Sequence, residues 1–293
     1  MARSLATVSP LARRIRLGAA VRRLRGNRPA AEVAKAAGVD RTVVSKVEAG
    51  DRRASLDTIL RLLDALLVEP EEARELLTVA RTGTATGWWN VAPYTAMGER
   101  QAKVADLECG ARIWEYQTSM LPGLLQTEAY ARYRARFAVD GGTEADIEAT
   151  VQARLRRQQA VFNEDGDGTY EVVLEPQAIQ RRPVPPDVMR EQLLHLHQLA
   201  TQTAKVEVRI LPVDARLAEG WVPRHPFAVY QYAGPGDLTL VAVDTVSEDL
   251  VLTAPNVAAD YARRFQDLRA GAVSVEESAA LIQQAAETLT AEA

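Results

Sequence analysis

The segment from Ala30 to Val47, AAEVAKAAGVDRTVVSKV, has the spacing of two short helices joined by a tight turn. Gly38 stands where the chain must reverse with little side-chain bulk, and Asp40 is placed to cap the second helix by accepting bonds from its free backbone N–H groups. Val44 and Val47, three residues apart, form the buried stripe of that helix. This pattern predicts a helix-turn-helix whose second helix, called the recognition helix below, is free to enter a DNA major groove.

Further helices are expected on both sides of this segment. Leu11 to Arg25 mixes apolar residues with arginines over about four turns, which is typical of an amphipathic helix with a basic outer face. Its apolar positions are Leu11, Ile15, Leu17, Ala19, Val21 and Leu24. Gly50 is expected to end the recognition helix, Ser55 to cap a fourth helix, and Pro70 to open a fifth that ends near Arg81. The apolar side of the fourth helix is expected to consist of Leu56, Ile59, Leu60, Leu62, Leu63 and Leu66. The pattern predicts a compact all-α domain.

Charge is unevenly distributed along the chain, although the net charge of the 293 residues is only −4. Residues 1–56 hold 13 Lys and Arg against 4 Asp and Glu, a net charge of +9, and the remainder carries −13. A basic head on an acidic body is typical of a DNA-binding module joined to a part that does not touch DNA. The alternative is a charged surface that is merely solvated.

The overall composition is that of a globular protein, with 47% hydrophobic and 25% charged residues over a length sufficient for two domains. Cys109 is the only cysteine, which excludes an intramolecular disulfide and fits a reducing compartment. The N-terminus lacks the apolar core of a signal peptide, and no run of about 18 apolar residues occurs. We therefore expect a cytoplasmic protein without membrane contact.

The run GVDRTVVSKVEAGDRRASLDTILRLLDAL at residues 38–66 is similar to a known family, and the similarity extends over residues 11–67. This region resembles the Xre-type (Cro/repressor-like) DNA-binding domain. The residues that occur at the family's spacing are Gly38, Val39, Ser45, Glu48, Gly50, Arg53 and Ser55. One departure is Ala30, where the family usually has a glutamine that helps to clamp the DNA backbone. Phosphate anchoring is therefore expected to depend more on the arginines.

The candidate DNA-binding residues are Arg41, Thr42, Val43, Ser45, Lys46, Arg52 and Arg53. The first four lie near the N-terminal part of the recognition helix, which meets the base edges in this fold. Arg41 could form a bidentate contact with guanine, and Thr42 and Val43 could touch a thymine methyl group, while Ser45 could bond a base or a phosphate. The last three are better placed for phosphates, which supply affinity and salt dependence but no sequence information.

Residues 81–98, RTGTATGWWNVAPYTAMG, break the helical pattern with glycine, threonine and proline. We interpret them as a linker between a DNA-binding domain at residues 1–80 and a second domain at residues 99–293. Trp88 and Trp89 are unusual for a free linker. They are expected to dock on the second domain, with a contact to a ligand or partner as the alternative.

The second domain is expected to be α+β with a small sheet. Helices are expected at residues 99–116, from Glu128, and at 143–163, 187–201, 255–270 and 275–290. Strands are expected at residues 170–174, 205–211, 227–232 and 238–243. The GPGD turn at residues 234–237 suggests that the last two strands form a hairpin, and NEDGDG at residues 163–168 is expected to be a turn.

Several runs in this domain also resemble a known family: SMLPGLLQTEAYARYRARF (119–137), LEPQAIQRR (174–182), EQLLHLHQLA (191–200), VEVRILP (206–212) and PFAVYQY (226–232). They are similar to the C-terminal domain of the actinobacterial Scr-type antitoxin-like transcriptional regulators. In that family an Xre-type head is fused to this acidic domain, and a small protein encoded nearby is the proposed partner. The PGLLQT motif marks the resemblance but implies no known chemistry.

Metal binding and catalysis are not expected. His195 and His197 are two apart on an expected helix, about 200° around its axis, so they cannot converge on one ion. His225 lies in a proline-rich loop, and residues 163–171 resemble a calcium loop only superficially. The second domain has no glycine-rich phosphate loop, nucleophile elbow or suggestively spaced Ser–Lys pair. We expect neither a cofactor nor an enzymatic activity.

These features predict a sequence-specific transcriptional regulator, active as a homodimer on double-stranded DNA. Two heads about 34 Å apart would read a palindrome. The second domain is expected to mediate dimerisation and to dock a small partner protein. The alternative is a small-molecule sensor, because the aromatic side chains could enclose an effector. The candidate pocket walls are Trp88, Trp114, Tyr116, Tyr130, Trp221 and Tyr232.

Overall fold

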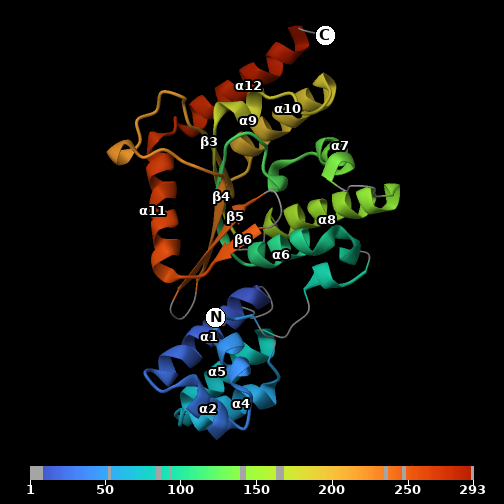
Figure 1. Cartoon of the computed structure of the whole chain (residues 1–293). Helices are drawn as coiled ribbons and strands as arrows, with labels where there is room; N and C mark the ends of the chain where they lie inside the picture. Colours follow the sequence, from blue (N-terminus) through green and yellow to red (C-terminus); the bar gives the residue numbers. More distant parts are fainter. Residues whose placement is uncertain are drawn as a thin grey trace. The chain divides into compact units, whose positions relative to one another are not determined.

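The computed structural model describes residues 9–51, 54–83, 87–92, 94–138, 143–162, 168–233, 237–245 and 249–291. The chain divides into two compact units, Met1–Trp88 and Trp89–Ala293 (Figure 1). The first unit is helical and the second combines helices with a mixed sheet, which confirms the expected fold class. No helix among the described residues has both the length and the apolar character needed to span a bilayer.

The described part of the first unit contains α1 (Pro10–Arg25), α2 (Ala30–Ala37), α3 (Arg41–Glu48), α4 (Leu56–Ala65) and α5 (Pro70–Gly83). The predicted local signals are present. Asp40 Oδ1 accepts a hydrogen bond from the backbone N–H of Thr42 at 2.7 Å and caps α3. Gly38 and Gly50, with φ values of 63° and 75°, end α2 and α3 in the left-handed conformation that glycine adopts most readily. The helix-turn-helix is therefore α2 and α3.

The core of the first unit is formed by apolar residues from these helices, including Leu17, Val21, Val33, Val44, Val47, Ile59, Leu62 and Leu63. Two expectations about its surface are wrong. On α1, Arg13 is buried and Ala19 is exposed, so this helix does not have a purely basic outer face. On α4, Leu56 and Leu60 are 37% and 43% exposed, because the buried stripe is centred on Ile59 and Leu60 lies about 100° around the helix from it.

The second unit is built on a six-stranded sheet with the order β3-β2-β1-β4-β5-β6. Its strands are β1 (Arg112–Gln117), β2 (Tyr170–Leu174), β3 (Val206–Ile210), β4 (Phe227–Tyr232), β5 (Leu238–Asp244) and β6 (Asp249–Leu252). The pairs β1–β2 and β2–β3 are parallel, and the other three pairs are antiparallel. The antiparallel β4–β5 pairing confirms the predicted hairpin, although residues 234–236 of its turn lie outside the described residues.

The expectation of a single helix over residues 99–116 is wrong in its second half. Helix α6 (Gly98–Glu108) ends before Gly110, which has a φ of 71°, and the chain continues as β1, next to the middle of the sheet. Both faces of β1 are covered by other elements, so its apolar residues do not alternate with polar ones. The short edge strand β6 was also not predicted.

Helices cover both faces of the sheet (Figure 1). Helix α11 (Pro255–Gly271) lies on one face, and α6 and α8 (Glu144–Phe162) lie on the other. Helix α7 (Glu128–Ala138) packs on α8, and α10 (Pro186–Gln202) and α12 (Val275–Ala291) pack together beside β3. Apart from α6, the predicted bounds of these helices agree with the structure to within two residues, and for α7 only the start was predicted. The remaining short helices are η2 (Trp88–Asn90), η3 (Tyr94–Met97), η4 (Gly123–Leu125), α9 (Pro176–Gln180) and η5 (Ala218–Gly220).

Candidate functional site

The recognition helix α3 presents one polar, exposed face and one buried face. The exposed side chains are Arg41, Thr42, Ser45 and Lys46. Val44 and Val47 are 0% and 3% exposed and pack into the core of the first unit. Val43 is half-buried against the same core, which leaves only part of its side chain for a thymine methyl group. The predicted phosphate contacts Arg52 and Arg53 lie outside the described residues.

Helix α1 packs closely against the C-terminal end of α3. A Cβ atom at Gly18 would lie 2.4 Å from the carbonyl oxygen of Val47, so the backbones approach as closely as glycine permits. The buried carboxylate of Glu48 accepts two hydrogen bonds from Arg25, at 2.5 Å from Nε and 2.9 Å from Nη2, and lies 3.6 Å from Arg22 Nε. These contacts fix the last turn of α3 while its first turn remains exposed.

Several basic side chains of the first unit form ion pairs or hydrogen bonds within that unit. A count of charges along the sequence cannot show this. Arg25 pairs with Glu48, Arg23 with Glu72, and Arg28 donates to the carbonyl of Ala65 at 3.1 Å. By contrast, the side chains of Arg41 and Lys46 form no ion pair within the part of the chain that the structure describes. The charges of these two side chains are therefore not neutralised by the described part of the chain.

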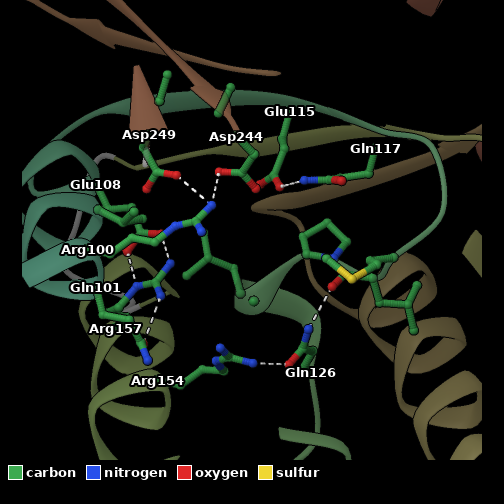
Figure 2. Close-up of a pocket in the computed structure, with 18 of the residues that line it drawn as sticks. Arg100, Gln101, Glu108, Glu115, Gln117, Gln126, Arg154, Arg157, Asp244 and Asp249 are labelled. Atoms are coloured by element: carbon green, nitrogen blue, oxygen red, sulfur yellow. Dashed lines mark hydrogen bonds and ion pairs between the residues drawn. The ribbon is translucent and has the colours of Figure 1, made fainter. Parts of the chain in front are cut away.

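The second unit contains a cavity of about 490 Å³ on the side of the sheet that faces α6 and α8 (Figure 2). This volume lies in the range of about 300–1,000 Å³ typical of small-molecule sites. Ala228 and Ala242, which pair across β4 and β5, leave space above the sheet because their side chains are small. The polar residues that line the cavity are Arg100, Gln101, Glu108, Glu115, Gln117, Gln126, Arg134, Thr150, Arg154, Arg157, Tyr230, Asp244 and Asp249.

Two of the cavity's arginines are paired with carboxylates. Arg157 on α8 contacts Glu108 on α6 through both ends of its guanidinium group, at 2.8 Å from Nε and 2.5 Å from Nη2. Arg100 Nη2 lies 2.6 Å from Asp249 and 3.4 Å from Asp244, which face each other across β5 and β6. Burial and the neighbouring Asp244 raise the pKa of Asp249 above its ordinary value. Both arginines therefore have carboxylate partners inside the protein.

Glu115 on β1 has hydrogen-bond donors around it but no arginine or lysine bound to it within the described chain. Its carboxylate accepts bonds from the hydroxyl of Tyr170 at 2.6 Å and from the amide of Gln117 at 2.9 Å. Burial raises the pKa of Glu115 to about 7. This group can therefore accept or donate a hydrogen bond near neutral pH.

The PGLLQT motif at residues 122–127 forms one wall of the cavity. Three glutamine side chains, those of Gln126, Gln158 and Gln192, donate to backbone carbonyls of the loop 121–126 at 2.7–3.1 Å. Because these bonds satisfy the carbonyls of an irregular segment, they hold it in one conformation. Gln126 also accepts a hydrogen bond from Arg154, so the motif positions a cavity residue.

The aromatic residues predicted as pocket walls do not line this cavity. Trp114 stacks on Phe265 with a centroid distance of 5.3 Å, and Tyr116 and Trp221 belong to the core beneath α11. Tyr130 is buried, the hydroxyl of Tyr232 donates to a backbone carbonyl, and Trp88 lies in the first unit. In the sequence, the PGLLQT motif was the signal that marked a wall of this cavity.

The remaining candidates do not form a site. His195 and His197 lie on α10, and His225 precedes β4 and faces the hydroxyl of Tyr261 at 3.3 Å. Within the described ranges, no three His, Cys, Asp or Glu side chains are grouped so as to hold a metal ion.

Comparisons with protein families divide the chain in the same way as its structure. A family model described as a helix-turn-helix domain matches residues 16–76, which include α2 and α3. A family model described as a domain of unknown function (DUF5753) matches residues 101–284, more than half of the chain, and includes the sheet and the cavity. No curated protein and no solved structure matches the chain. The first match indicates a DNA-binding regulator.

Proposed function

The chain belongs to the family defined by the domain of unknown function DUF5753, and we propose that it is a sequence-specific DNA-binding transcriptional regulator. The observation that carries this proposal is the arrangement of α3. This helix is capped by Asp40, fixed from behind by α1, and exposes Arg41 and Lys46 without internal ion pairs among the described residues. The helix-turn-helix match at residues 16–76 supports the same assignment.

The finer assignment rests on the family resemblances of the sequence. We infer a regulator of the Xre type, antitoxin-like, whose second unit mediates dimerisation and docks a small partner protein encoded nearby. No enzymatic activity and no cofactor are part of this proposal. Two heads would bind half-sites about 34 Å apart. Analytical ultracentrifugation with and without a palindromic duplex should show a dimer, and a monomer under both conditions would contradict this part of the proposal.

Replacing Arg41 with alanine should weaken binding to the specific site by about 10- to 100-fold, because a bidentate guanine contact is worth about 1–3 kcal/mol. Binding to random DNA should change little. The site would be selected from a random duplex library with the unmodified protein, and affinities would be measured by fluorescence anisotropy. Arg74→Ala, an exposed arginine on α5, is the control. Equal losses of affinity for specific and random DNA would show that Arg41 does not contact the bases.

Replacing Lys46 with alanine should weaken binding to all sequences and reduce the slope of log K against log salt by about 0.9, the value for one lost phosphate contact. Arg53→Ala should have the same effect if the sequence-based assignment of Arg53 is correct. Both slopes would be measured between about 50 and 200 mM salt. A slope equal to that of the unmodified protein would argue against a phosphate contact at that residue.

The cavity of the second unit favours a second candidate function, a regulator that senses a small molecule. Its volume of about 490 Å³ and its lining by charged side chains from α6, α8 and the sheet support this alternative. An effector that binds one DNA-binding state better than the other would shift the affinity for DNA by its differential affinity for the two states. The two candidates are compatible, since one chain could bind both a partner protein and an effector.

A further inference from the structure

Arg154 differs from Arg100 and Arg157, the paired arginines of the cavity, because it has no carboxylate partner among the described residues. Its Nη1 donates to the amide oxygen of Gln126, and its Nε is buried without a hydrogen-bond acceptor (Figure 2). Burial and the nearby guanidinium of Arg157 lower the pKa of Arg154 to about 10. A guanidinium held in this way is destabilised relative to one that is paired, so an added anion would stabilise it.

A second arginine lines the cavity, and its charge helps to lower the pKa of Arg154. Arg134 on α7 donates to the sulfur of Met120 at 3.3 Å and forms no ion pair within the described ranges. Arginine side chains bind carboxylate and phosphate groups through charge-assisted, often bidentate hydrogen bonds. Arg134 and Arg154 together therefore form a cationic wall that the protein itself leaves without anions.

There is room for a ligand next to this wall. A Cβ atom at Gly123 would lie 3.7 Å from Arg154 Nε and 3.7 Å from Arg157 Nη1, which is van der Waals contact, so the glycine keeps this wall of the cavity free of a side chain. On the sheet side, Ala228 and Ala242 form the floor. A side chain added at position 123 would occupy space that the ligand needs.

The sheet side of the cavity has the opposite chemistry. Glu115, Asp244 and Asp249 line it, and Arg100 is the cation that contacts the two aspartates. These oxygens accept hydrogen bonds, so they suit hydroxyl or amino groups and disfavour a second anionic group. A ligand that spans the cavity should therefore be anionic at one end and rich in hydrogen-bond donors at the other.

We propose that the cavity binds a small polar organic anion, with its carboxylate or phosphate group on Arg154 and Arg134 and its hydroxyl or amino groups facing Glu115 and Asp244. This inference rests on the second candidate function, the sensing of a small molecule, and does not depend on DNA binding. In this arrangement Gln126 of the PGLLQT motif is a positioning residue, because it orients Arg154 towards the ligand.

The test is isothermal titration calorimetry on the full chain without DNA. The anionic probes are glucose 6-phosphate, gluconate and inorganic phosphate, and the matched neutral probe is glucose, which has hydroxyl groups but neither a phosphate nor a carboxylate group. At least one anionic probe should bind with a Kd of about 1 mM or tighter, and its neutral counterpart should not bind. Binding of glucose 6-phosphate alone would assign a phosphate ligand, and binding of gluconate alone would assign a carboxylate ligand.

Three variants test whether the bound probe occupies the cavity. Arg154→Gln should weaken the bound probe at least tenfold, and Gly123→Ala should also weaken it while all charges are retained. Arg136→Gln, an exposed arginine on α7, should leave the affinity unchanged. If Arg154→Gln does not fold, Gly123→Ala decides the question. The proposal is overturned if no anionic probe binds, or if binding survives both cavity variants.

The outcome is separable from that of the DNA experiments. If a probe binds but leaves the affinity for the selected duplex unchanged, the proposed ligand site stands and the sensing function is refuted. A chain that shifts DNA but binds none of the anionic probes would retain the regulator and refute the ligand site.

Discussion

Replacing Arg157 with methionine is expected to destabilise the second unit by about 3–5 kcal/mol, because it leaves one member of a buried ion pair without its partner. The carboxylate of Glu108 and the guanidinium of Arg157 are 5% and 8% exposed, and they make a bidentate contact that links α6 to α8. Removing the arginine leaves Glu108 buried next to methionine, where its charge has no compensating cation. Urea unfolding would measure the loss in the free energy of unfolding. Hydrogen exchange of the amides of β1 and β4 would show whether the loss occurs in the second unit.

The matched control is a double variant. When Glu108→Leu is combined with Arg157→Met, no buried charge is left unpaired, so the double variant should be at least about 2 kcal/mol more stable than Arg157→Met alone. Arg136→Met on the surface of α7 controls for the loss of an arginine. A loss below about 1 kcal/mol in Arg157→Met would show that the pair is solvated and that the cavity wall is looser than its geometry indicates.

The features of the fold that depend on neighbouring residues could be predicted from the sequence. The cap at Asp40 and the glycines at positions 38 and 50 act within four residues of the helix ends they define, so their chemistry is visible in the local pattern. Strands β2 to β5 are flanked by turn residues and were predicted nearly to the residue. Their identification required no knowledge of which strands pair.

The features that depend on distant residues could not be predicted in the same way. Strand β1 is covered on both faces, so its order in the sheet, between β2 and β4, determines its conformation more than its own pattern does. Helix α1 is a second example. From the sequence Arg25 is expected to be a solvated cation, whereas in the structure it is paired with Glu48. Local periodicity carries no information about such partners.

The cavity is the clearest case of this limit. Arg154, Glu115 and Asp244 come from a helix and two strands that are far apart in the sequence, and only the fold brings them around one space. Which arginines are neutralised also depends on the fold, since Arg157 has a carboxylate within 2.5 Å and Arg154 has none among the described residues. The aromatic residues chosen from the sequence were needed for the core. The PGLLQT motif was the one local pointer, but its role became visible only through the hydrogen bond between Gln126 and Arg154.

Replacing Gly18 with valine is expected to destabilise the first unit by about 3 kcal/mol and to abolish binding to the selected duplex. A Cβ atom at this position would lie 2.4 Å from the carbonyl oxygen of Val47 and 2.7 Å from that of Glu48. Both are backbone atoms of the recognition helix, so no rotamer change relieves the overlap. The helix must move away from α1 or its last turn must unwind, and in either case the exposed face of α3 loses its fixed orientation.

Ala19→Val is the matched control, because this neighbouring residue on α1 is exposed and the added methyl groups enter solvent. Hydrogen exchange should show faster exchange in α1 and α3 of Gly18→Val, with no change in β1 or β4 of the second unit. Fluorescence anisotropy should show duplex binding by Ala19→Val and none by Gly18→Val. If Gly18→Val bound the duplex with unchanged affinity, the close crossing of α1 and α3 would not be what orients the recognition helix, and DNA binding would have to use another surface.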